Sequence, residues 1–100
     1  MNIEPVTTDP HFGGQLVCLV TDPPAWSWAR IAITQGAMLV DAQYVRVGGL
    51  GGVLTTTPTF TLGPTTNWTA GAAKAHVELG IWAKSGKWRQ LDDFTIDIAS

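Results

Sequence analysis

The side chains that could do chemistry are few, and their spacing in the sequence brings none of them together. His11 and His76 lie far apart, and neither has a cysteine or carboxylate at the spacing of a metal-ligand set. Asp92 and Asp93 are adjacent, so on a strand their carboxylates point to opposite faces and cannot work as an acid/base pair. We therefore expect no metal site and no catalytic pair of carboxylates.

None of the remaining motifs indicates a catalytic reaction. Cys18 is the only cysteine, which excludes an internal disulfide, and its apolar neighbours predict a buried, inert thiol rather than a nucleophile. The glycine run 48–52 lacks the lysine and the strand-to-helix context of a phosphate-binding loop. Asn67-Trp68-Thr69 matches the glycosylation sequon, but the sequence shows no secretory signal, so we interpret the match as accidental. The sequence predicts no enzymatic activity, no catalytic residue and no cofactor.

Five tryptophans in one hundred residues are the unusual feature. Trp68 is placed to plug the core as the corner aromatic does in immunoglobulin domains. Trp26 and Trp28 share one face of an extended segment, while Trp82 and Trp88 flank a later polar turn. Exposed tryptophans anchor protein interfaces or stack on sugar rings, and the alternative is that they cap the ends of the core. These four tryptophans fall in two separate turns, and few Asp, Asn or Arg residues lie nearby to orient the hydroxyl groups of a sugar. We therefore expect no sugar binding.

The stretch from residue 68 to residue 98 organises the elements around these residues. Apolar residues alternate with polar ones in two runs joined by a short polar turn, which is typical of a β-hairpin. The alternating apolar residues are Ala73, Ala75, Val77, Leu79 and Ile81, then Phe94, Ile96 and Ile98. A helix over 68–82 competes, because apolar residues there also recur at spacings of three and four, but Gly71 and Gly80 disfavour it.

The rest of the chain adds short strand-like segments bounded by turn signals. The predicted strands are 3–8, which Pro5 confines to an edge or a bulge, then 15–21, 26–34, 38–40, 44–47 and 55–62. The glycine run 48–52 is predicted to be a mobile loop unless a partner holds it. With the final hairpin, this predicts one all-β domain over residues 1–100, an immunoglobulin-like antiparallel β-sandwich of about seven strands.

The alternation also predicts which residues are buried and which face a partner. The predicted core is Leu16, Cys18, Ile31, Ile33, Phe60, Leu62, Ala75, Val77, Leu79, Phe94 and Ile96, with Trp68 against it. Strand 15–21 is apolar on its second face as well, so Val17 and Leu19 require a third layer, either a loop of this chain or another protein. The predicted interface residues are Val17, Leu19, Trp26, Trp28 and Met38.

Composition narrows the classes of partner. Only 14% of the residues are charged, where about 25% is usual, so part of the surface is expected to be covered, unless threonine supplies the missing polarity. The net charge of −2 and the scattered basic residues exclude the clustered basic face of a nucleic-acid-binding protein. The longest apolar run, 16–20, is too short to span a bilayer. We expect a protein made in the cytoplasm, without a signal peptide and without membrane association.

Several short segments together resemble a known pattern that spans nearly the whole chain. They are Phe12-Gly13-Gly14, Gln35-Gly36, Phe60-Thr61-Leu62-Gly63, Trp68-Thr69-Ala70-Gly71-Ala72-Ala73, and Leu91 with Phe94-Thr95-Ile96. In this combination the chain resembles small immunoglobulin-like virion proteins of tailed bacteriophages that infect actinobacteria. Such relatives are capsid decoration proteins, minor capsid proteins or tail proteins, so the resemblance implies a structural role without catalysis.

The resemblance yields a specific expectation about function. A single domain without a tail-assembly partner domain suits a capsid decoration protein, located on the virion surface and bound to the preformed shell. Its expected partners are the major capsid protein, further copies of itself, with a homotrimer as one arrangement, or both. The alternatives are a minor tail protein and a carbohydrate-binding module that uses exposed tryptophans to attach to a host glycan.

Overall fold

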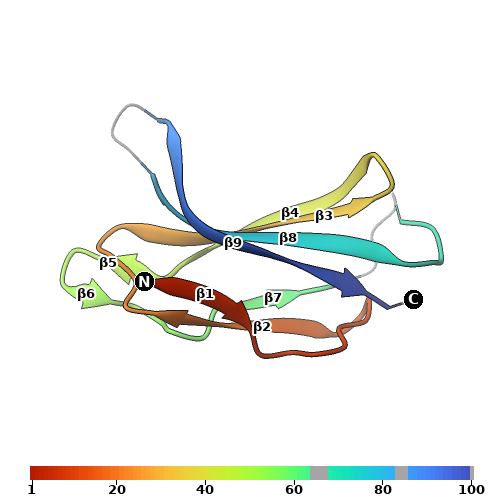
Figure 1. Ribbon diagram of the computed structural model, residues 1–100, viewed down its shortest axis with the longest axis horizontal. Coiled ribbons are helices and arrows are strands. Elements are labelled where there is room, and N and C mark those ends of the chain that lie inside the picture. The colour runs from red at the N-terminus through yellow and green to blue at the C-terminus, as the bar shows by residue number, and fades with distance from the viewer. Residues whose placement is uncertain (64–67, 83–85, 100) are drawn as a thin grey trace.

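Two larger antiparallel β-sheets pack face to face, and a small two-stranded sheet lies at one end (Figure 1). The computed structural model describes residues 1–63, 68–82 and 86–99. One sheet has the order β1-β2-β7, formed by β1 (Asn2–Pro5), β2 (Gln15–Thr21) and β7 (Thr59–Thr61). The other has the order β4-β3-β8-β9, formed by β3 (Ser27–Gln35), β4 (Met38–Arg46), β8 (Ala73–Trp82) and β9 (Trp88–Ile98).

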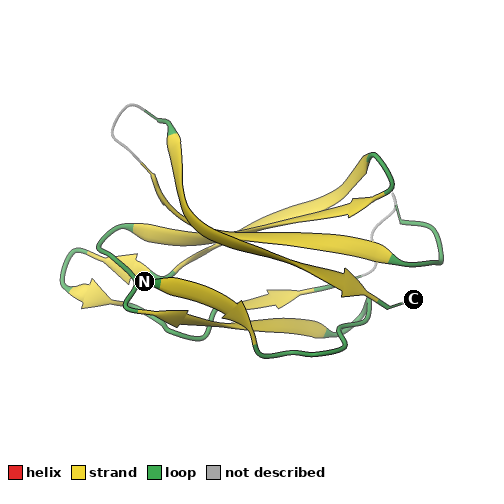
Figure 2. Cartoon of the chain, in the orientation of Figure 1, coloured by secondary structure: helices red, strands yellow, loops and turns green. Residues whose placement is uncertain are grey.

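The all-β expectation is confirmed, since the described residues contain strands and turns but no helix (Figure 2). The predicted final hairpin is the β8–β9 pair, and the competing helix over 68–82 is wrong because β8 pairs along its whole length with β9. Pro5 closes β1, which lies at the edge of its sheet as predicted. Asn67 of the sequon and Lys84 and Ser85 of the predicted turn lie outside the described residues.

Two predictions about the middle of the chain are wrong. The predicted strands 38–40 and 44–47 are one strand, β4, because residues 41–43 continue the pairing with β3. A register shift beside Ile33 leaves Val40 as an extra residue of β4, and its side chain is buried. The glycine run is a small hairpin of β5 (Gly48–Gly49) and β6 (Gly52–Val53) rather than a loop.

The core lies between the two sheets and follows the predicted alternation. Nine of the predicted core residues are buried: Leu16, Cys18, Ile31, Ile33, Phe60, Leu62, Ala75, Val77 and Leu79. Phe94 and Ile96 are only partly buried, contrary to prediction, because they lie on β9, an edge strand. Trp68 is also partly buried against the core and stacks at 4.4 Å on Phe12. Burial raises the pKa of the Cys18 thiol to about 12, so the thiol stays protonated and inert.

Candidate binding site on the four-stranded sheet

The outer face of the four-stranded sheet carries an aromatic cleft at the end where β3 begins and β8 finishes. The cleft has a volume of about 1000 Å³. Its lining residues are Trp26, Trp28, Tyr44, Arg46, Ile81, Trp82 and Gly86. At this end the β8–β9 hairpin rises away from the two layers (Figure 2), so its last residues stand beside the sheet face rather than over the core. We refer to this feature as the aromatic cleft.

Strand pairing brings the cleft's cationic and aromatic groups together. Trp28 of β3 pairs with Arg46 of β4, and both side chains point outward because the alternate residues of each strand face the core. The Arg46 guanidinium lies 5.0 Å from the ring centre of Trp26 and 5.6 Å from that of Trp28. Such cation–π contacts contribute about 0.5–1 kcal/mol each at exposed sites. Arg46 therefore fixes both indoles while its own N–H edge remains exposed.

Tyr44 and Trp82 line another part of the cleft, and Trp88, which is not a lining residue, packs against both. Trp82 and Trp88 are the last cross-strand pair of the β8–β9 hairpin, and their rings lie 6.4 Å apart at 75°. Tyr44 meets Trp82 at 6.4 Å and 72°, and Trp88 at 6.1 Å and 77°. These edge-to-face contacts contribute about 0.5–1.5 kcal/mol each beyond the area they bury. The rings therefore hold one another at steep angles.

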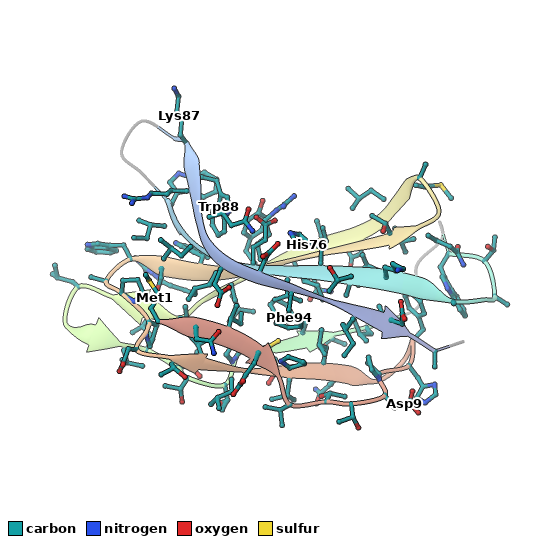
Figure 3. The ribbon with its side chains drawn as sticks, in the orientation of Figure 1. Met1, Asp9, His76, Lys87, Trp88 and Phe94 are labelled. Carbon is teal, nitrogen blue, oxygen red and sulfur yellow. The ribbon has the colours of Figure 1, made fainter. Side chains whose placement is uncertain are left out.

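Gly80 gives Trp88 its place on the sheet. A side chain at Gly80 would overlap the indole of Trp88, which lies directly against the β8 backbone. Figure 3 shows Trp88 and His76 on the outer side of the sheet and Phe94 on the side that faces the other layer. A register shift between Leu79 and Gly80 adds a local irregularity just where the hairpin bends outward. Glycine is thus required for the packing of the hairpin, although it interrupts the apolar and polar alternation.

Trp26 is held in an uncommon backbone conformation. Its φ of 64° lies in the left-handed region, which costs about 1–3 kcal/mol for a bulky residue. The turn before it is fixed by Ser27, whose Oγ and backbone N–H both donate to the Pro24 carbonyl, at 2.6 and 3.2 Å. Gly48 lies so close to that carbonyl that a side chain there would overlap it. The loop thereby presents the Trp26 side chain, 44% exposed, at the mouth of the cleft.

A row of charged side chains borders the cleft on the same sheet face. Arg30 donates to Glu78 at 2.7 Å and to the Tyr44 hydroxyl at 3.2 Å. Burial lowers the pKa of Arg30, but the hydrogen bonds to Tyr44 and Glu78 outweigh it, so the pKa is raised overall. The Arg30 guanidinium is therefore hydrogen-bonded within the domain, and its bond to the Tyr44 hydroxyl orients Tyr44, which lines the cleft.

His76 has the carboxylate neighbours that its sequence spacing did not reveal. Its Nε2 lies 3.5 Å from Glu78 Oε1 on the same strand and 3.4 Å from Asp93 Oδ2 on β9. Within the described ranges, no three His, Cys, Asp or Glu side chains are arranged to hold a metal ion. Asp92, by contrast, accepts from the Ile3 backbone N–H, so Asp92 and Asp93 do not share a site.

The structure separates the five predicted interface residues into three places. Trp26 and Trp28 meet in the aromatic cleft. Met38 is exposed as the first residue of β4, at the far end of the same sheet. Val17 and Leu19 lie on the outer face of the other sheet, where Leu19 is 37% exposed and Val17 is partly covered. Their role in an interface remains a prediction.

The premises of the expectation about sugars are wrong. Three of the tryptophans that seemed to fall in separate turns line one cleft, because β3, which follows Trp26, pairs with β8, which ends at Trp82. Arg46 also lies next to Trp26 and Trp28, where the sequence suggested few orienting groups. Tyr44, Arg46 and Ile81 were missed. To identify these three residues one would need to know that Trp28 pairs with Arg46 and with Gly80. No local sequence pattern predicts that register.

Comparison with known proteins returned no match: no protein-family model, no curated protein and no solved structure is significantly similar to this chain. In the part of the chain that is described, no helix has the length and apolar character needed to cross a bilayer.

Proposed function

We propose that this protein is a non-enzymatic binding module, an immunoglobulin-like sandwich that docks on a partner protein as a virion accessory protein. Capsid decoration is the favoured role, with the major capsid protein as partner. The observation that carries the proposal is the aromatic cleft, which joins Trp26, Trp28, Tyr44 and Trp82 to Arg46. Trp, Tyr and Arg are the residues most enriched at the energetic centres of protein interfaces.

The exposure of these rings supports a covering partner. Trp26, Tyr44 and Trp82 are each 44–52% exposed although they lie together. A side chain of this kind buries roughly 150–250 Å² when it is fully covered, and about half of that area is still exposed here, so the three rings supply roughly a quarter to a third of the ~1,000 Å² that a stable interface needs. A contiguous aromatic surface on a small domain is typical of a binding site.

Other exposed apolar residues are consistent with more than one contact in an assembly. The tip of the β5–β6 hairpin presents Leu50, which is 82% exposed, with Val53 and Leu54 beside it. Leu19 and Val6 are exposed on the three-stranded sheet. A subunit of a shell surface contacts both the shell and its own copies, so apolar residues on several sides fit this role.

The test is co-sedimentation of the purified protein with capsid particles assembled from the major capsid protein of the same genome. We expect saturable binding that falls at least tenfold in Trp82→Ala and in Trp28→Ala, with Lys74→Ala, exposed at the start of β8 and away from the cleft, as the control. Circular dichroism verifies that each variant is folded. Absence of binding, or binding that none of the cleft variants weakens, contradicts the proposal.

A second candidate is a carbohydrate-binding module for host attachment, and one observation favours it: three tryptophans share a single cleft. We still expect no sugar binding, because the rings meet at steep angles and, among the described residues, Arg46 is the only charged one that lines the cleft. Tryptophan fluorescence titrated with host cell-wall polysaccharide tests this expectation. A saturable shift that is lost in Trp82→Ala would favour the glycan-binding role instead.

A further inference from the structure

We infer that the occupant of the aromatic cleft is an extended, proline-rich segment of the partner protein that carries acidic side chains. This inference rests on the proposed function, because it specifies the partner chemistry of the same site. Three independent properties of the cleft support it, namely the angles between its rings, its hydrogen-bonding groups and its charge.

The ring geometry fits small apolar side chains better than a stacked planar ligand. Tyr44 and Trp82, which both line the cleft, meet at 72°, and Trp88, outside the lining, meets them at 77° and 75°. Rings at these angles form corners rather than one flat platform, and corners accept the compact ring of proline or a branched aliphatic side chain. Aromatic-lined grooves of this kind recognise polyproline II segments, whose stiffness lowers the entropy lost on binding.

The hydrogen-bonding groups of the cleft are almost all donors. Arg46 contributes a guanidinium, and the three lining tryptophans contribute indole N–H groups. The Tyr44 oxygen already accepts from Arg30 Nε, which leaves its own proton to donate. No lining residue within the described ranges carries a carboxylate or an amide side chain. Proline-rich chains offer carbonyl acceptors without N–H donors, so they match this set, whereas sugar hydroxyls need acceptors as well.

The free positive charge indicates acidic side chains in the segment. Arg46 lines the cleft and is exposed. Lys87, just before β9, and Arg89, on β9, are also exposed, although neither lines the cleft. None of the three forms an ion pair with any residue of the described ranges, whereas Arg30 is paired with Glu78. The whole chain has a net charge of −2, so the positive character is local to this end. Charge complementarity therefore favours an anionic segment at the cleft.

The first experiment measures fluorescence anisotropy of a labelled synthetic peptide with alternating prolines and leucines and a glutamate at each end. We expect saturable binding that weakens at least tenfold when the glutamates are replaced by lysines, and again when the prolines are replaced by alanines. Trp82→Ala, at an exposed position, should remove binding. Arg46→Glu should reverse the preference toward the lysine-ended peptide, while Lys74→Glu, on the same sheet face but away from the cleft, should leave it unchanged.

The same peptide, used as a competitor in the particle co-sedimentation assay, separates the two proposals. If the cleft variants lose particle binding but no peptide binds or competes, the proposed function stands and the proline-rich assignment is wrong. If the peptide binds but particle binding does not depend on the cleft, the docking role is wrong. A neutral oligosaccharide or a single-stranded oligonucleotide that binds more tightly than the acidic peptide would also overturn the inference.

Discussion

At the scale of single residues, Trp26 gives the strongest support to the binding role that we propose for this surface. A tryptophan at φ 64° is held against its own backbone preference, yet its ring is 44% exposed and adds little to the core. Strain of this kind persists only where neighbouring structure enforces it, here the Ser27 contacts with Pro24 and the close approach of Gly48. The strained backbone conformation places the Trp26 indole beside Arg46.

The first prediction is that Trp26→Gly abolishes binding at the cleft but leaves the free energy of unfolding nearly unchanged. Glycine adopts positive φ freely, so relief of about 1–2 kcal/mol of strain should offset the lost contact with Arg46. Urea unfolding should give a free energy of unfolding within about 1 kcal/mol of the parent, while cleft binding is lost. Trp28→Gly, in the middle of a strand pair, should be clearly less stable. A loss of several kcal/mol in Trp26→Gly would show that the ring is structural instead.

The second prediction concerns Cys18 at alkaline pH. Because the folded thiol titrates near 12 and the unfolded thiol near 9.0, folding disfavours ionisation. The thiol's contribution to stability is therefore complete below about pH 9 and decreases by roughly 1.4 kcal/mol per pH unit from there toward pH 12. Between about pH 7 and about pH 10, the parent should lose about 1.4 kcal/mol more than Cys18→Ala, measured by urea unfolding. Equal losses in the two proteins would contradict the buried state of the thiol.

At the scale of elements, the pairing of strands is what creates the cleft. The alternation of Ala73, Ala75 and Val77 was enough to predict a strand and its inward face, because burial of one face imposes a period of two on the sequence itself. The position of Gly80 between Trp28 and the ring of Trp88 was not predictable, since it depends on register and on the order β4-β3-β8-β9. Register joins residues far apart in the chain, and no local pattern contains it.

The third prediction is that Gly80→Ala disturbs the β8–β9 hairpin. A Cβ there overlaps the Trp88 indole, so the ring must shift, at a cost of about 1–3 kcal/mol in the free energy of unfolding. The near-ultraviolet circular dichroism of the packed aromatic rings should change, and cleft binding should weaken because Trp88 supports Trp82 and Tyr44. Gly51→Ala is the matched control, since it has open space around it and should stay within about 0.5 kcal/mol. An unchanged spectrum in Gly80→Ala would rule out this packing.

At the scale of the whole molecule, the candidate contact surfaces lie on opposite sides of the two layers. The aromatic cleft is on the outer face of the four-stranded sheet, and Leu19 is exposed on the outer face of the other sheet. The sequence indicated both surfaces, the first through its tryptophans and the second through a doubly apolar strand, but it did not indicate that they face apart. A domain with two such faces is suited to lie between neighbours in an assembly, which agrees with the proposed role on a shell.

The last prediction tests the second of these faces with Val17→Lys and Leu19→Lys together. Leu19 meets solvent and Val17 is partly covered, so long lysine stems can lie along the sheet with their charges in water. The isolated domain should therefore melt cooperatively, within about 1 kcal/mol of the parent, while binding to capsid particles is abolished. Thr21→Lys, on the same face near the end of β2, is the control for added charge.

Each alternative outcome of this test has a definite meaning. If the double variant unfolds, the second apolar face of β2 is part of the domain's own packing, and the argument for a partner there fails. If it folds and binds particles as the parent does, the three-stranded sheet faces solvent in the assembly and the aromatic cleft is the docking surface by itself. Only a folded variant that fails to bind shows that the domain is covered on both sides, as the scarcity of charged residues in the sequence suggests.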